Sequence, residues 1–478
     1  MNFRRWVVFT FLVHVLVVAV DKGGGLILYL LCANQPQEHG KSGIAASLPF
    51  ILGAVANLGL ATSLVYFVRR GRYAAQTAFE TSMGVALAWG GFVAIAAAAI
   101  TLWVLPWIGG EEWRFDPIVV VPICLAVPLL LVASYANSTQ LATDRIRDYG
   151  VVHVVTSLAF LPAFFGFFFG FGGEVADGDV PVAVAWGRVA STLVVAALAL
   201  WLVRSVVTLR VRVDRAYLND AVRYGWKANL TSTLTYLNHR LDLPVLALVY
   251  YAMLVGQGTD DEEARRLAGV QVAFYSMAVT WAELVWHFPE AMRDLFFSKV
   301  AGSTHEQARQ LTPILSRLGL AISLFGALAI VFLVDPIMSL ITIAAKGDDG
   351  VWLREWSPTV SASLLVLVPG TVAFTVSKVL QADLAARDRL QTCVNAQLVV
   401  LVTMLGLDVL LIPEHGAVGA AAASTIAYVV STIYTAVVYG RQTRTPIWRF
   451  LIVHTGDFRY IRDIVVAVLD KVRRRGRR

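Results

Sequence analysis

Long apolar stretches recur along the whole sequence, and this feature constrains the fold more than any other. Each stretch has about 20 residues or more, enough for a helix to cross the ~30 Å hydrocarbon core of a bilayer. Lipid accepts only helices and closed barrels, because backbone polar groups find no water there. A barrel would show segments of about ten residues with alternating polarity, whereas these runs are continuous and rich in Leu, Ala, Val and Phe. Only 15% of the residues are charged, against roughly a quarter in soluble domains.

The apolar pattern predicts an all-α polytopic membrane protein with about twelve membrane-spanning helices. The expected spans are residues 6–33, 43–68, 81–108, 117–142, 151–172, 181–209, 229–255, 268–298, 311–335, 358–382, 390–412 and 416–439. The first six end at Leu209, and the other six follow a basic segment. We therefore expect two six-helix bundles, a plan that is common among transporters.

The distribution of basic residues predicts the orientation of these helices. Of the 40 Lys and Arg residues, 31 fall on the side that carries both chain ends, and 6 fall on the other side. Cytoplasmic loops carry the excess of Lys and Arg in membrane proteins, so we expect both termini in the cytoplasm. The net charge of +7 comes mostly from these segments. It suits anionic membrane lipids as partners and does not indicate nucleic acid.

Four regions follow along the chain. Residues 1–209 form the N-terminal six-helix bundle, 210–228 a basic cytoplasmic connector, 229–440 the C-terminal six-helix bundle, and 441–478 a basic cytoplasmic tail. The tail mixes apolar and charged residues ahead of a polybasic end, which favours an amphipathic helix on the membrane surface. A solvated, partly disordered tail is the alternative, because polybasic ends are often disordered.

Ionisable residues inside the predicted spans indicate where function lies. An Arg or Lys at the centre of a spanning helix costs about 2.5–3.5 kcal/mol on insertion scales, so such residues usually face a bundle interior or a water-filled cavity. The set consists of Asp21, Lys22, His239, Arg240, Asp242, Glu283 and Asp408. Each bundle begins with a helix that carries a cation, Lys22 in the first and Arg240 in the second. Internal pairing, for example of Asp242 with Arg240 or with Lys22, is the alternative interpretation.

Motifs of enzymes and of metal sites are missing from the sequence. It has no P-loop, no G-x-S-x-G, no H-E-x-x-H and no C-x-x-C. Its three cysteines lie in or beside apolar runs, without metal or disulfide spacing. We therefore expect a transporter that uses no metal and no cofactor, and not an enzyme.

Several segments, in order along most of the chain, resemble the Wzx-type polysaccharide and O-antigen flippases. This family belongs to the multidrug/oligosaccharidyl-lipid/polysaccharide (MOP) exporter superfamily. The segments that carry the resemblance are Gly59–Phe67, Tyr224–Leu230, Leu237–Asp242, Ala282–Ala291, Gln381–Arg389 and Leu411–Ser424.

The resemblance implies a MATE-like fold in the bacterial inner membrane. It implies export of an oligosaccharide linked to a polyprenyl pyrophosphate, by alternating access, in polysaccharide or lipopolysaccharide biosynthesis. In that role Lys22, Arg240, His239 and Asn238 would bind substrate, with Lys22 and Arg240 as a clamp on the pyrophosphate. Asp21, Asp242 and Glu283 would pair with these cations or carry a coupling ion, H⁺ or Na⁺. Polysaccharide polymerase or assembly proteins would be further partners.

Two other functions stay open at this point. A cation-coupled small-molecule efflux antiporter of the same superfamily would favour lone acidic residues over cations in its cavity. A membrane glycan polymerase or transferase would need a large catalytic loop. The longest connectors between the predicted spans have only about twenty residues, well below the size of a domain.

Overall fold

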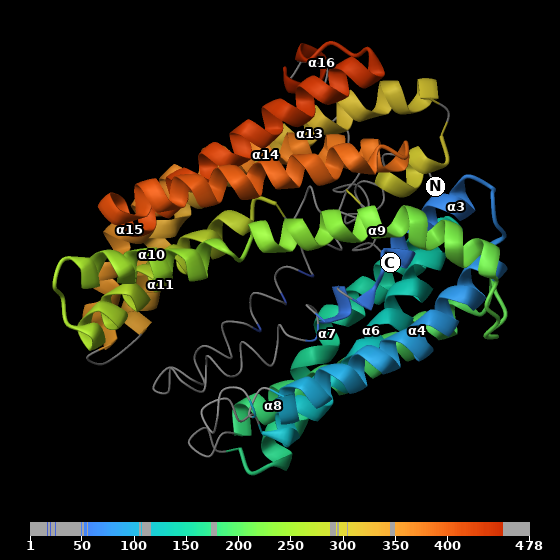
Figure 1. The fold of residues 1–478 in the computed structure, drawn as a ribbon, viewed down its shortest axis with the longest axis horizontal. Coiled ribbons are helices and arrows are strands. Elements are labelled where there is room, and N and C mark those ends of the chain that lie inside the picture. The colour runs from blue at the N-terminus through green and yellow to red at the C-terminus, as the bar shows by residue number, and fades with distance from the viewer. Residues whose placement is uncertain are drawn as a thin grey trace, which may run out of the picture. The chain divides into compact units, whose positions relative to one another are not determined.

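The described residues of the protein are helical apart from turns and short connections, as a computed structural model shows (Figure 1). The model describes residues 52–104 except 55, 116–173, 179–286, 296–344 except 304, and 349–452, with the single positions 17, 20, 24, 49, 107 and 293. The chain divides into two compact units, and the division falls between Asn229 and Leu230. Most of the predicted first span 6–33, most of the start of span 43–68, and most of the tail 441–478 lie outside the described residues.

Seven helices in the described part of the chain are long and apolar enough to cross a membrane. They are α4 (Ala75–Ala99, continued by η1, Ile100–Val104), α6 (Pro117–Ala142), α7 (Ile146–Gly170), α8 (Asp179–Val203), α13 (His305–Ala344), α14 (Asp349–Ala386) and α15 (Leu390–Thr443). Shorter helices are α3 (Leu60–Arg69), α9 (Arg215–Asn238), α10 (Asp242–Gly256), α11 (Asp261–Glu283) and α16 (Trp448–Leu451). The predicted all-α polytopic membrane fold is confirmed.

The bounds of α6 show how the sequence sets a helix. Asp116 precedes it, and its carboxylate accepts a hydrogen bond from the Ile118 amide at 2.9 Å. Pro117 occupies the first helical position, where its missing N–H is no loss. The helix then runs to Ala142, which is the predicted span 117–142.

The 54-residue helix α15 is a hairpin of two spanning helices. Gly416 interrupts it with φ 54° and ψ −127°, a conformation that glycine adopts without steric cost. The two limbs then run side by side, since the Ser431 hydroxyl donates to the Ala396 carbonyl at 2.9 Å. The separate predicted spans 390–412 and 416–439 are these two limbs.

The predicted single helix 229–255 is wrong at its centre and at its start. Residues 239–241 form a turn between α9 and α10, so two helices replace one. At the other end, α9 begins at Arg215, because the Asp214 carboxylate caps it by accepting from the Tyr217 amide at 2.9 Å. Most of the predicted connector 210–228 is therefore helical. Only its first residues are extended.

The predicted span 268–298 is also interrupted. Helix α11 runs from Asp261 to Glu283, and a turn follows over residues 284–286. The Asp260 carboxylate caps the start of α11 by accepting from the Glu262 amide at 3.2 Å.

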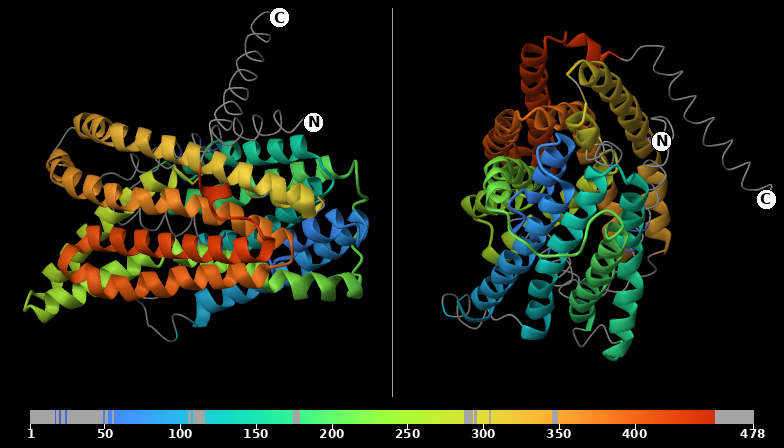
Figure 2. Two further views of the ribbon diagram at one scale, coloured as in Figure 1. Left: turned by 90° about the horizontal axis from the view of Figure 1, so that it is seen from above. Right: turned by 90° about the vertical axis from the view of Figure 1, so that its right-hand side faces the viewer.

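Each unit has its own apolar core. In the N-terminal unit, α3, α4, α6, α7 and α8 bury a cluster that includes Leu60, Phe79 and Leu131. In the C-terminal unit, α10, α11, α13, α14 and α15 bury a second cluster around Trp286, Phe374 and Tyr428. Figure 2 shows α13, α14 and α15 running side by side, and α16 lies against α13.

One close contact in the N-terminal unit predicts a large loss of stability. Gly59 has φ +71°, and a Cβ there would lie 1.9 Å from the Gly225 carbonyl oxygen of α9. Gly59→Ala should therefore lower the melting temperature strongly, because both backbone strain and a backbone clash oppose it. Gly71→Ala is the matched control, since Gly71 has φ +68° with nothing within 4 Å. Gly71→Ala should lower the free energy of unfolding only by the ~1–2 kcal/mol that a left-handed backbone conformation costs a residue with a Cβ. Equal melting temperatures for the two variants, measured in detergent, would contradict this packing.

Candidate functional site

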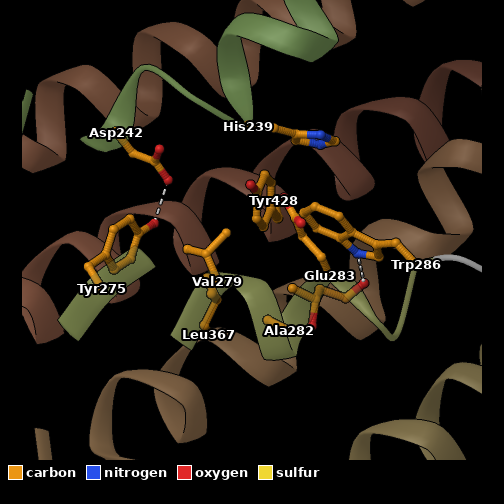
Figure 3. Close-up of a pocket in the computed structure, with 10 residues that line it drawn as sticks. His239, Asp242, Tyr275, Val279, Ala282, Glu283, Trp286, Leu367 and Tyr428 are labelled. Atoms are coloured by element: carbon orange, nitrogen blue, oxygen red, sulfur yellow. Dashed lines mark hydrogen bonds between the residues drawn. The ribbon is translucent and has the colours of Figure 1, made fainter. Parts of the chain in front are cut away.

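The two helix breaks of the C-terminal unit meet at one pocket. Residues of the 239–242 turn and of the 283–286 turn line it together with side chains of α11, α14 and α15 (Figure 3). The lining residues are His239, Asp242, Tyr275, Val279, Ala282, Glu283, Trp286, Leu367, Thr371 and Tyr428. Broken helices at membrane depth place polar groups where substrates and coupling ions bind in transporters. The pocket is therefore the candidate functional site of this unit.

Arg240 forms an ion pair across the two breaks. Its Nη2 lies 3.5 Å from Oε1 of Glu283, and its side chain remains 50% exposed. At this length the pair is looser than a charge-assisted hydrogen bond of about 2.7–2.9 Å. Arg240 thus pairs with Glu283 and not with Asp242, the partner given as an example from the sequence. The guanidinium still has exposed donors for an anionic ligand.

Asp242 is held by a hydroxyl network. Its Oδ2 accepts from the Tyr275 hydroxyl at 2.6 Å, and its Oδ1 accepts from the Leu243 amide at 2.9 Å. The Tyr275 hydroxyl also lies 3.0 Å from Oγ of Ser424. Figure 3 shows Asp242 and Tyr275 pointing toward one another.

Asp408 is a second buried acid near this network. It lies in the first limb of α15 with none of its side chain exposed. In the described part of the chain neither of its carboxylate oxygens has a hydrogen-bond partner. Ionised carboxylates of Asp408 and Asp242 would repel each other. Burial and this repulsion favour a proton or a bound cation on one of the two acids.

Trp286 brings together the basic and aromatic groups of the site. Its ring stacks on His239, with centroids 4.6 Å apart, and its indole N–H donates to the Thr371 carbonyl at 3.0 Å. The ammonium of Lys378 lies 4.1 Å from the centre of the same ring. These contacts place two basic side chains next to the pocket, beside Arg240.

Lys378 is one of the 31 basic residues that the charge distribution assigns to the cytoplasmic side. It does not lie in a loop, because it is buried within α14. The sequence contains a signal for this burial, because Lys378 falls inside the predicted apolar span 358–382. Tyr275 and Ser424 carried no such signal, because hydroxyl residues are common in spanning helices and only the packing of α10, α11 and α15 brings them to Asp242.

The Asn238 side chain is hydrogen-bonded within the protein. It is fully buried at the end of α9, and its amide donates to the backbone and the side-chain oxygen of Gln397 at 3.0 and 2.9 Å. Gln397 donates in turn to Gln381 at 2.9 Å. This arrangement ties the end of α9 to α14 and α15 and so fixes where the break begins. A direct role of Asn238 in substrate binding stays a prediction.

The other predicted residues have mixed outcomes. His239, Asp242 and Glu283 line the pocket, and Arg240 lies beside it. Lys22 and Asp21 lie outside the described residues, so the clamp of Lys22 with Arg240 stays a prediction. Within the part of the chain that the structure describes, no group of three or more His, Cys, Asp and Glu residues is arranged to hold a metal ion.

The size of the pocket limits its ligand. Its empty volume of about 250 Å³ includes the open mouth, and the enclosed part holds no more than about one water molecule. In this conformation it has room for an ion or a small polar group, not for a whole saccharide or drug.

Known structures share this architecture over nearly the whole chain. A MATE transporter crystallised in complex with MaL6 superposes with a TM-score of 0.72 at 14% identity, covering 92% of this chain and 96% of that one. An outward-facing multidrug resistance MATE transporter gives 0.69 at 13% identity, covering 94% and 97%. A MOP superfamily transporter from Pyrococcus furiosus, described as having a binding pocket of reverse polarity, gives 0.67 at 13% identity, covering 94% and 97%. The chain has the fold of the MOP superfamily.

A comparison of the sequence with models of protein families found one match. Residues 290–469 match the family model of the lipid II flippase MurJ. A search of curated proteins found no match. The matched segment contains Lys378, Asp408 and Ser424, which contribute to the site or its surroundings, while Arg240 and Asp242 precede it. The MOP fold thus agrees with the predicted superfamily.

Proposed function

We propose that this chain is a flippase that moves a saccharide linked to a polyprenyl pyrophosphate across the bacterial inner membrane. The observation that carries the proposal is Arg240, a half-exposed guanidinium at a helix break inside a membrane protein of the MOP fold. A cation costs free energy at this depth, and an anionic ligand offsets that cost. The match of residues 290–469 to a lipid II flippase family supports a substrate of the same chemical class.

The site suits the headgroup of such a substrate. A pyrophosphate needs cations shielded from bulk water, where their attraction is stronger. His239 and Lys378 supply basic groups against Trp286, and Arg240 lies beside the pocket, paired with Glu283. In this conformation the pocket is too small for the pyrophosphate or the glycan, so we assign it the coupling ion and leave both parts of the substrate to the open state of the transport cycle.

Asp242 and Asp408 are the proposed coupling residues. Their buried carboxyl groups, with the hydroxyls of Tyr275 and Ser424, offer oxygen ligands for a proton or a cation. Glu283 is the proposed resting partner of Arg240, displaced when the pyrophosphate binds.

A cation-coupled efflux antiporter is the second candidate. Asp242 and Glu283, which line the pocket together with the aromatic rings of Trp286 and Tyr428, favour it because organic cations bind such surroundings. Two of the similar solved structures are MATE transporters, one of them a multidrug resistance protein.

A competition experiment separates these functions. Purified full-length protein in nanodiscs would be titrated with a synthetic polyprenyl-pyrophosphate disaccharide and, separately, with tetraphenylphosphonium. We expect saturable binding of the pyrophosphate lipid and no competition by the organic cation. Tight binding of tetraphenylphosphonium without binding of the pyrophosphate lipid would favour the antiporter.

A further inference from the structure

The segment before α9 is an extended strap on the surface of α4. Residues 207–214 have no helical structure. At one end the Thr208 backbone amide donates to the side-chain oxygen of Gln76 at 2.8 Å. The side-chain amide of Gln76 donates back to the Thr208 carbonyl at 3.0 Å. At the other end the Thr81 hydroxyl accepts from the Asp214 amide at 3.0 Å. The strap is therefore fixed in place.

The strap covers one end of the lipid-facing side of α4. Val213 and Val211 lie 3.0 and 3.4 Å from where a Cβ of Gly84 would be, so both valines rest on this glycine. Ala88 and Ile95 lie on the same face of the helix as Gly84. Both are exposed, Ile95 to 73%. An exposed apolar face on a helix long enough to span a membrane suits contact with acyl chains, and the strap borders that face of α4.

The strap alternates apolar and basic residues. Leu209, Val211 and Val213 are 52%, 58% and 51% exposed, and the arginines between them, Arg210 and Arg212, are exposed too. Successive side chains of an extended chain point to opposite sides. The apolar edge thus rests on α4 with about half of each valine still exposed, and the basic edge points away from α4.

Neighbouring residues mark this level as the membrane interface. At the end of α8, the Arg204 guanidinium lies 5.2 Å from the ring centre of Trp201, which is 55% exposed. Trp is enriched at the boundary between hydrocarbon and headgroups. The nearby acids are engaged in the fold, Asp214 as the cap of α9 and Glu80 with Gln76.

We infer that the strap is a binding site for anionic phospholipid. Leu209, Val211 and Val213 contact the acyl chains near the headgroups, and Arg210 and Arg212 bind the phosphate. Headgroups of this charge complement the basic edge, and the apolar edge continues the lipid-facing side of α4. The inference does not depend on the transported substrate, because all of these residues lie outside the pocket.

Lipid titration of matched variants tests this site. Purified full-length protein in a neutral detergent would be titrated with phosphatidylglycerol, and bound lipid would be counted by native mass spectrometry. At about 1 kcal/mol per basic residue near an anionic surface, R210Q/R212Q should weaken binding roughly thirtyfold. R265Q/R266Q removes the same charge from exposed arginines of α11 and should leave binding unchanged. Leu209→Gln, which keeps the charge, should weaken binding by several-fold.

Three outcomes would overturn the inference. They are unchanged binding by R210Q/R212Q, equal loss in R265Q/R266Q, and displacement of the lipid by millimolar inorganic phosphate. Melting temperatures in detergent without lipid provide the folding control, and we expect them to be unchanged because the Arg210 and Arg212 side chains are exposed.

Discussion

Replacing Arg240 with alanine is expected to reduce translocation of a pyrophosphate-linked saccharide by about 10- to 100-fold, with normal membrane insertion. A hydrogen bond to a charged group contributes roughly 1.5–3 kcal/mol of binding free energy. Each 1.4 kcal/mol lost corresponds to about a tenfold loss. Arg240 is half-exposed and makes a long ion pair with Glu283 at 3.5 Å, so its removal takes away a ligand contact without opening the core. Transport in proteoliposomes and protein content of the membrane fraction are the two measurements.

Two variants control this experiment. Arg240→Lys keeps the charge but loses the planar guanidinium, so it should retain part of the activity. Arg265→Ala removes an exposed arginine that pairs with Asp261 on the surface of α11 and should behave as wild type. Full transport by Arg240→Ala would exclude this residue from the site. Lys22→Ala is expected to act like Arg240→Ala if the predicted clamp exists.

Replacing Asp408 with asparagine is expected to lower transport at least tenfold while leaving stability unchanged or higher. Asp408 is fully buried, and its carboxylate oxygens have no hydrogen-bond partner in the described part of the chain. A buried charge without partners is costly, so a residue kept only for structure would not be an aspartate here. Loss of activity together with gain of stability is the behaviour of a functional site.

Transport driven by defined ion gradients checks this expectation. In proteoliposomes the wild type should respond to a proton or a sodium gradient, and Asp408→Asn should lose that response. Asp408→Glu, which keeps the carboxyl group, should retain it in part. A melting temperature lowered by Asp408→Asn, with transport still coupled to the gradient, would assign Asp408 to the fold instead.

The sequence predicts spanning helices well where local signals set them. The cap at Asp116 and Pro117 gives the start of α6, and the segment up to Gly416 separates the limbs of α15. Apolar pattern does not predict the breaks at 239–241 and 284–286. Hydropathy is averaged over a window of about 19 residues, so the apolar turn 284–286 leaves no mark. The polar residues from Asn238 to Asp242 are visible in the sequence, but polarity alone does not indicate a turn.

The candidate site could be predicted only in part. The cost of charge in lipid singles out Arg240, Asp242, Glu283 and Asp408 from the sequence alone. Their partners come from packing between helices distant in sequence. The Tyr275 hydroxyl reaches Asp242 from α11, and the Lys378 ammonium reaches Trp286 from α14. No periodicity within one helix encodes such contacts.

The central claim is that this chain moves a lipid-linked saccharide across a bilayer. The direct measurement uses proteoliposomes that hold a fluorescent polyprenyl-pyrophosphate disaccharide, with an added glycosidase that cleaves only outward-facing headgroups. The account predicts that wild-type protein makes the inner-leaflet pool cleavable, and that Arg240→Ala does not. Protection of that pool by wild-type protein, with active efflux of an organic cation from the same vesicles, would contradict it.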